Sequence, residues 1–491
     1  MGEVTVAGEK LLSAMALPEI YEARGFRPLW QERGNEEALL GEIAAASGEG
    51  LDPMDYHFET LRAALERRRQ QPENAMAAAT ADLLLTDALL RLAAHSHFGK
   101  LDPVTSKPRW DLAQSIRGES GAVVAVRIAT GSALALQLGE LRPVQPLYGR
   151  LKSALARYRV MAREGGWDPL PPGGVLQVGM DDARVPLLRR RLSTMGDFPG
   201  IILDSQRFEP ALEDAVRRFQ ARHGLEPDGL FGPASAGVLN QPLEQRVDQL
   251  KANLERARWL LSEVRGQFLI VDPAGRRVVL MDNSQPVMEQ GANFTAAARS
   301  AGEFRTDMRY LVVNPDWILP AQLVETQVAP LARRNPAQLE ARGLQVFNRA
   351  GEVIDPSRAD WDRPSALLVR QLPGPRSFLG TLRFSMPNAR QVFLHGGPGE
   401  GDALAGSIRL EDPLALARAL SGPPAAWTRE ELAEAISSGS PRTLPLGRPV
   451  PVLYGPWSAW VDPAGTVYFR QGHEDLDAPI IAGLRRGAAD R

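Results

Sequence analysis

The hydrophobic pattern of the chain changes its period at Gln267, and this change limits the fold more than any other feature. Before Gln267, apolar residues recur at helical spacing, as in residues 75–97 and 146–163. After it, short apolar runs alternate with turns, and residues 268–271 and 277–280 flank an Asp-Pro-Ala-Gly turn typical of a hairpin. The sequence therefore predicts a multi-domain α+β protein with a helical first half and a β-rich second half.

Composition shifts divide the chain further. Its 491 residues are enough for two to four domains, and the proline- and glycine-rich stretch 168–174 has the composition of a linker. The apolar steps of four and three residues in 241–265 predict one long amphipathic helix that braces the domains. The expected parts are a helical scaffold domain at 1–167, a module of three short helices at 175–240, a connecting helix at 241–266, and a β-rich domain at 267–491 with a helical insertion near 322–342.

Composition also excludes several classes of function. A hydrophobic share of 44% and a charged share of 24% are ordinary for a globular protein. The net charge of -2 comes without a dominant basic patch, so we expect no nucleic-acid partner. The absence of cysteine excludes disulfides, thiolate metal ligands and thiol catalysis. No run is long enough to cross a membrane, and the first residues lack the pattern of a secretory signal. We expect no cofactor and no metal.

Residues 391–410, QVFLHGGPGEGDALAGSIRL, are the best candidate for a functional site. An apolar strand over 392–394 ends at His395, and a glycine-rich loop follows. The chain becomes regular again at Gly406 and Ser407, just before a helical pattern. This arrangement can bring an imidazole to a hydroxyl, and backbone N–H groups near Ser407 to a carbonyl oxygen.

Simpler interpretations of these histidines and glycines stay open. A strand-end histidine is commonly structural, and a glycine-rich loop is commonly a turn. A phosphate cradle would need the lysine and glycine spacing of the P-loop, which are missing. A metal site of His395, Glu400 and Asp402 would lack a second histidine nearby. The other candidate histidines are interpreted as helix-surface or capping residues; they are His57, His95 and His97.

A first resemblance lies in the module after the linker. Residues 215–240, AVRRFQARHGLEPDGLFGPASAGVLN, resemble peptidoglycan-binding domains, in which Phe-Gln, His-Gly-Leu and Asp-Gly-x-x-Gly occur in this order. The resemblance implies binding to cell-wall glycan or peptide, although such modules can also be spacers. Phe219, Leu225 and Leu230 are expected to form the small core in either case.

A second resemblance covers nearly the whole chain. The motifs that carry it are RGFRPLW, GLDPMDYHF, NPDWILP, LPGPRSFLGTLRFSMPN, VFLHGGP and PVLYGPWSAWVDPAGTVYFR. In this order they are similar to the large multi-domain L,D-transpeptidases of Gram-negative bacteria. The resemblance implies a YkuD-type catalytic fold, a periplasmic location, and acyl transfer between the tetrapeptide stems of peptidoglycan.

The resemblance also assigns roles to single residues. It implies that His395 is the base, that Ser407 occupies the position of the nucleophilic cysteine, and that the amides around Gly406 and Ser407 are oxyanion donors. Arg409 would orient a substrate carboxylate or hold the loop, and Gly396 is placed with it among the substrate-binding positions.

The chain differs from the family at and near the position of the catalytic nucleophile. Ser407 replaces the cysteine, Gly397 stands where the family usually has threonine, and Leu404 and Ala405 replace a polar pair. Twelve positions separate His395 from Ser407, so the covering loop is shorter than in the family. A serine needs a base during attack and a third group that orients the base. Three hypotheses follow: an enzyme that uses Ser407, a binding protein without turnover, and a trapped cysteine-to-serine mutant.

Overall fold

The computed structural model describes residues 4–108, 116, 118–165, 167–201, 204–374, 376–397, 406–423, 427–472 and 474–487. Two compact units make up the chain. One combines Met1–Val264 with Trp457–Arg491, and the other is Arg265–Pro456. The last 35 residues of the expected domain at 267–491 thus lie in the first unit. In the described part of the chain, no helix combines the length and hydropathy that a bilayer-spanning segment needs.

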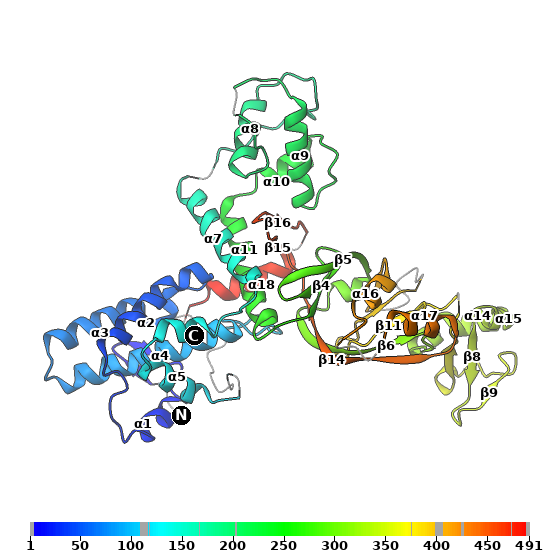
Figure 1. Ribbon diagram of the computed structural model, residues 1–491, viewed down its shortest axis with the longest axis horizontal. Helices are drawn as coiled ribbons and strands as arrows, with labels where there is room; N and C mark the ends of the chain where they lie inside the picture. The colour runs from blue at the N-terminus through cyan, green and yellow to red at the C-terminus, as the bar shows by residue number, and fades with distance from the viewer. Residues whose placement is uncertain are drawn as a thin grey trace. The chain divides into compact units, whose positions relative to one another are not determined.

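The helical scaffold of the first unit is built around α4 (Ala75–Phe98) (Figure 1). This helix is buried over most of its length. Asn74 caps this helix by accepting hydrogen bonds from the N–H groups of Met76 and Ala77. The helices and short strands around it share one hydrophobic core. They are β1 (Thr5–Val6), β2 (Glu9–Lys10), α1 (Leu17–Glu22), α2 (Arg33–Ala45), the 3₁₀ turns η1 (Ala46–Glu49) and η2 (Pro53–Tyr56), α3 (Phe58–Gln70), α5 (Gly121–Thr130) and α6 (Leu134–Gly139).

The three-helix module follows as expected, with its own core. It consists of α8 (Val185–Thr194), α9 (Pro210–Arg222) and α10 (Pro233–Leu239). Phe219 is fully buried and Leu225 is partly buried against the same core, whereas Leu230 is 37% exposed and is not a core residue. Gln220 holds the Asp-Gly turn in place: its Oε1 accepts from the N–H of Gly229 at 2.9 Å.

The long helix α11 (Leu243–Leu261) differs from the amphipathic brace that its sequence predicts, because its polar side is buried as well. It packs against α7 (Pro146–Arg163) and α18 (Glu474–Arg485). Arg256 donates to Asp477 at 2.5 Å, and Arg258 pairs with Glu255 at 2.6 Å. The returning tail supplies Asp477 to this lining and lies in the first unit. It also carries the hairpin of β15 (Ala459–Val461) and β16 (Val467–Phe469).

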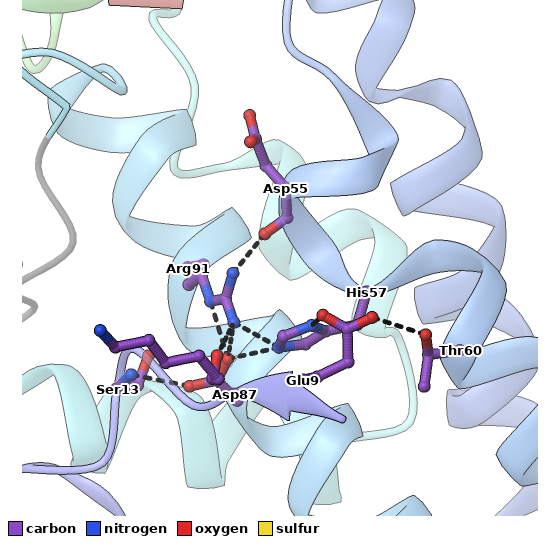
Figure 2. Close-up of polar contacts among 8 residues, drawn as sticks. Glu9, Ser13, Asp55, His57, Thr60, Asp87 and Arg91 are labelled. Carbon is purple, nitrogen blue, oxygen red and sulfur yellow. Dashed lines mark hydrogen bonds and ion pairs between the residues drawn. The ribbon is translucent and has the colours of Figure 1, made fainter. Parts of the chain in front are cut away.

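A buried polar cluster joins η2, α3 and α4 to the N-terminal hairpin (Figure 2). His57 lies between two carboxylates, with Nδ1 2.9 Å from Glu9 Oε2 and Nε2 2.8 Å from Asp87 Oδ2. Arg91 Nε donates to Asp87 Oδ2 at 2.7 Å, and the N–H of Ser13 donates to Asp87 Oδ1 at 2.7 Å. These contacts connect three sequence-distant segments of the scaffold.

The helix-surface interpretation of the scaffold histidines is wrong. His57 occupies the N-cap position of α3 with a left-handed backbone, but its ring is buried. His95 is buried inside α4, where its Nδ1 lies 2.9 Å from the hydroxyl of Tyr56. His97 is also buried, with Nδ1 3.2 Å from the carbonyl of Leu141. The helical pattern misled because α4 is surrounded by packed elements, so its polar positions are also interior.

The second unit is an eight-stranded closed barrel in the order β11-β12-β13-β5-β4-β3-β14-β6. Two neighbouring pairs are parallel, β12 with β13 and β14 with β3. Alternate residues point inward, and Leu394, Ile408 and Leu410 lie in the core. The strands are β3 (Phe268–Asp272), β4 (Arg277–Asp282), β5 (Gln285–Phe294), β6 (Phe304–Val313), β11 (Leu382–Phe384), β12 (Phe393–His395), β13 (Ser407–Leu410) and β14 (Arg442–Tyr454).

The expected helical insertion carries a small sheet of its own, in the order β7-β10-β8-β9. Its core includes Val328, Trp361 and Val369. The insertion contains β7 (Trp317–Ile318), α13 (Ala321–Leu323), the π-helical turn η3 (Val324–Val328), α14 (Ala329–Arg334), α15 (Ala337–Ala341), β8 (Leu344–Phe347), β9 (Val353–Ile354), η4 (Pro364–Ala366) and β10 (Leu368–Gln371). Three further helices of this unit are α12 (Ala296–Arg299), α16 (Pro413–Ala419) and α17 (Arg429–Ser437).

Candidate functional site

His395 ends β12 and faces away from the barrel interior. Because Leu394 points into the core, the alternation of the strand places Phe393 and His395 on the outer face. Arg383 on β11 and Arg409 on β13 are the residues in register with His395 on its two sides. The imidazole is nevertheless fully buried. The site thus begins with a shielded histidine between two arginines.

Ser407 is the first residue of β13 and shares this outer face. It is in register with Phe393, two positions before His395, so the histidine and the serine are diagonal neighbours on adjacent strands. Such positions are roughly 7–8 Å apart, within reach of a long side chain. Among the described residues no hydrogen bond joins the imidazole to the hydroxyl. The structure therefore brings the two predicted residues together without direct contact.

One hydrogen bond engages Nδ1 of His395. The N–H of Gly397 donates to Nδ1 at 3.1 Å, and in this arrangement the proton of the neutral ring is on Nε2. Nε2 has no hydrogen-bond partner in the described part of the chain. No described carboxylate therefore orients the ring.

Burial and charge act together on this imidazole. The pKa of His395 is lowered to about 4. Burial of the ring is the largest cause, and the positive charges of Arg409 and Arg383 follow. The carbonyl of Phe378 opposes this shift. The ring is therefore neutral at physiological pH and is a much weaker base than an ordinary histidine.

This shift predicts a loss of stability in mild acid. The folded-state pKa of about 4 lies below the ordinary 6.5, so the neutral ring stabilises the fold above pH 6.5, and the contribution is lost as the pH falls from 6.5 toward 4. The loss is at most about 3 kcal/mol. Denaturant unfolding of the protein and of His395→Gln across this range measures it. Parallel stability curves for the two proteins would contradict the prediction.

Glycines allow two backbone segments to cross beside the histidine. A Cβ on Gly397 would lie 1.8 Å from the carbonyl oxygen of Phe378. A Cβ on Gly380 would lie 2.6 Å from backbone atoms of Gly396 and Gly397. The threonine that the family usually has at position 397 therefore cannot fit without moving the 378–380 segment. The close approach of residues 378–380 therefore gives a physical reason for glycine at position 397.

The remaining predicted site residues have clear structural surroundings. Gly406 has a φ of +82°, and a Cβ there would lie 2.4 Å from the carbonyl oxygen of Gln391. The N–H of Gly396 donates to Leu382 at 3.0 Å and thereby continues the strand pairing of β11. Ser407 is anchored through its carbonyl, which accepts from the N–H of Thr295 at 3.2 Å. These contacts hold the strand ends that carry the histidine and the serine.

Some predictions cannot be compared with the structure. Glu400 and Asp402 of the metal alternative, and the altered pair Leu404 and Ala405, lie outside the described residues. Within the described residues, no group of three or more potential ligands could hold a metal ion.

Sequence reasoning missed a cavity of about 750 Å³ on the outer face of the barrel. Arg383 and Phe393 line it, and the ring of Phe393 lies 5.7 Å from that of His395 between centroids. The opposite wall comes from the insertion, including Trp317 and, from η3, Thr326 and Gln327. Alternation in 382–385 could have indicated that Arg383 faces outward, but the insertion wall has no such signal.

Comparisons with known proteins agree with these features. A family model described as a scaffold domain matches residues 15–155, and one described as a putative peptidoglycan binding domain matches residues 181–239. A putative L,D-transpeptidase from Haemophilus influenzae is 29% identical over 162 residues, which are 31% of this chain. The match covers 33% of the relative, so the chain spans about a third of its length.

Two solved structures are also similar, but only weakly. One is an L,D-transpeptidase from Xylanimonas cellulosilytica, with 13% identity, a TM-score of 0.16, and coverage of 58% of this chain and 98% of the other. The second is a fused Zn-dependent amidase/peptidase/peptidoglycan-binding protein from Clostridium acetobutylicum, with 13% identity, the same TM-score, and coverage of 58% and 100%. At such TM-scores these matches carry no argument.

The chain combines segments that match the scaffold and putative peptidoglycan-binding models with a barrel that carries a strand-end histidine beside a serine. About a third of it is similar in sequence to a putative L,D-transpeptidase, in agreement with the predicted resemblance. The helical first part and the β-rich barrel confirm the predicted fold class.

Proposed function

We propose that this protein acts at the peptidoglycan of the periplasm by binding tetrapeptide stems on the outer face of the barrel, with little or no acyl transfer. The sequence similarity to an L,D-transpeptidase and the match to a peptidoglycan-binding domain support the place of action. The cavity lined by Arg383 and Phe393, which are in register with His395 and Ser407, supports binding of a peptide there, since its volume is typical of ligand sites.

The state of His395 carries the proposal that turnover is weak. A serine hydroxyl must lose its proton to a base as it attacks, and a third group must hold that base in the correct tautomer. Here the lone pair of Nδ1 already accepts from Gly397, the pKa of the ring is lowered to about 4, and no described carboxylate contacts Nε2. Ser407 therefore lacks the activation that acyl transfer would require.

A second candidate is an acyltransferase or peptidase that uses Ser407. The observation in its favour is that His395 and Ser407 share the outer face as diagonal neighbours, with Arg409 beside them. It requires His395 to exchange its bond to Gly397 for one to Ser407 when a peptide binds.

Incubation with purified disaccharide-tetrapeptides separates the two candidates. We expect binding of the stems, an unchanged affinity in Ser407→Ala, and no cross-linked dimer or trimmed stem by mass spectrometry. A cross-linked or trimmed product that disappears in Ser407→Ala would establish the second candidate instead. Failure of any stem to bind would reject both.

A further inference from the structure

Among the described residues that line the cavity, Arg383 is the one with a charged side chain. It lies on β11, between Val312 of β6 and His395 of β12 in register, and its side chain is exposed. Its guanidinium carbon lies over the Phe393 ring, 6.0 Å from the centroid, and both residues line the cavity. A group bound to Arg383 would thus lie directly beside the predicted site.

The charge of Arg383 is not matched within the described part of the chain, where no carboxylate lies within ion-pair distance of it. Some arginines of the same unit are matched, as Arg277 is by Asp272 at 3.1 Å, and others, such as Arg390, have no carboxylate partner among the described residues either. Arg383 differs from Arg390 in that it lines the cavity. An arginine that has no partner in a cavity is suited to an anion supplied by a ligand, since the guanidinium binds a carboxylate through two parallel hydrogen bonds.

The rest of the wall favours an extended peptide as the ligand. Three aromatic side chains provide apolar surface, and amide side chains from both walls provide hydrogen-bonding groups. Asn388 instead fixes the backbone of this wall, because its Nδ2 donates to the carbonyls of Met386 at 2.6 Å and Val392 at 2.7 Å and its Oδ1 accepts from the N–H of Val392. The aromatic residues are Tyr310, Trp317 and Phe393, and the other amide residues are Gln322, Gln327 and Gln391.

We propose that Arg383 binds a side-chain carboxylate of the peptide in this cavity, and so determines specificity for anionic stems over amidated ones. The inference rests on the proposed function, because it assumes that a stem peptide occupies the cavity. It adds the chemical feature that is recognised and the residue that recognises it. Arg409 is on the far side of His395 from Arg383, so the two arginines can serve different groups.

Occupancy of Arg383 has a consequence for His395. The positive charge of Arg383 is one of the causes that lower the pKa of His395. A bound carboxylate offsets that charge, so an anionic peptide raises the pKa of His395 toward its ordinary value, whereas an amidated peptide does not. This gives a readout in the site that is independent of affinity.

The test compares two synthetic tetrapeptide stems, one with a free side-chain carboxylate and one with that group converted to a carboxamide. By calorimetry at low salt we expect the full chain to bind the carboxylate form about 10–100-fold more tightly. Arg383→Gln is expected to bind both forms equally, and Arg383→Lys to keep part of the preference. Arg390→Gln, an exposed arginine outside the cavity wall, is the matched control and should keep the full preference.

Each outcome is decisive. Equal binding of both peptides by the unmodified chain, or an undiminished preference in Arg383→Gln, would overturn the role of Arg383 and leave the proposed function intact. Failure of the chain to bind either peptide would overturn the proposed function and the inference together. NMR titration of His395 should show a higher pKa with the carboxylate peptide only; the same shift with both peptides would also contradict the inference.

Discussion

Ser407→Cys is expected to become acylated by a carbapenem, whereas the unmodified chain stays free of adduct. Intact-mass measurement after incubation should show the full inhibitor mass added, because opening the lactam ring by the sulfur leaves nothing to depart. The acylation rate should rise by roughly 10³-fold or more, since a missing nucleophile or base typically costs that much.

The two nucleophiles differ in the proton transfer that they require from His395. A serine must transfer its proton during attack, and the lone pair on Nδ1 that would accept it is engaged by Gly397. A thiol has a pKa near 8.5 and ionises before attack. Arg383 and Arg409, in register with His395 on either side, are positive charges that favour a thiolate nearby. The site can therefore activate sulfur while leaving oxygen inert.

Ser385→Cys is the matched control for this experiment. Ser385 follows β11, lines the cavity, and its N–H donates to Tyr310 at 2.9 Å, so a thiol there has similar access but is displaced from the predicted nucleophile position. It should gain no adduct beyond background. Equal labelling of both variants would show that position 407 has no special reactivity, and an unreactive Ser407→Cys would mean that more than the nucleophile has been lost.

The sequence predicted the strand that ends at His395 because an apolar run followed by glycines has few other structures. It also predicted the hairpin of β3 and β4, whose Asp-Pro-Ala-Gly turn is a local signal. By contrast, β5 was not predicted. Its first residues, Gln285–Val287, are exposed, and Met288, Ala292 and Phe294 contact the core with the polar Gln290 between them, so the sequence shows no regular apolar alternation.

The parts of the site that depend on tertiary contacts were not predictable. The crossing of Gly397 by Phe378 depends on a segment about 20 residues away in sequence, and the cavity depends on an insertion that folds separately. The sequence assigns residues 457–491 to the barrel domain because their strands continue the β pattern of that domain. The buried contacts of Ser458 with Asn253 and Asp477 place this segment in the first unit, and no local pattern encodes them.

Asp87→Asn is expected to destabilise the first unit by about 3–5 kcal/mol, the usual cost of removing one member of a buried charge pair. Asp87 and Arg91 are both fully buried, and His57 is nearly so. The substitution keeps the shape of the side chain but removes the carboxylate that Arg91 and His57 contact (Figure 2). Denaturant unfolding followed by circular dichroism of the helical scaffold measures the change.

The direction of the pH dependence gives an independent check on this cluster. Burial alone would raise the pKa of Asp87, but the hydrogen bond from His57 and the charge of Arg91 outweigh it and lower the pKa below its ordinary 3.8. The ionised carboxylate therefore stabilises the scaffold above pH 3.8, and this contribution is lost as the pH falls through the lower folded-state value. Asp87→Asn should lose that part of the acid sensitivity.

Glu119→Gln, which breaks the exposed pair with Arg127 at 2.7 Å, should change stability by less than about 1 kcal/mol. Equal effects of the two substitutions would mean that the buried cluster contributes no more than a surface ion pair.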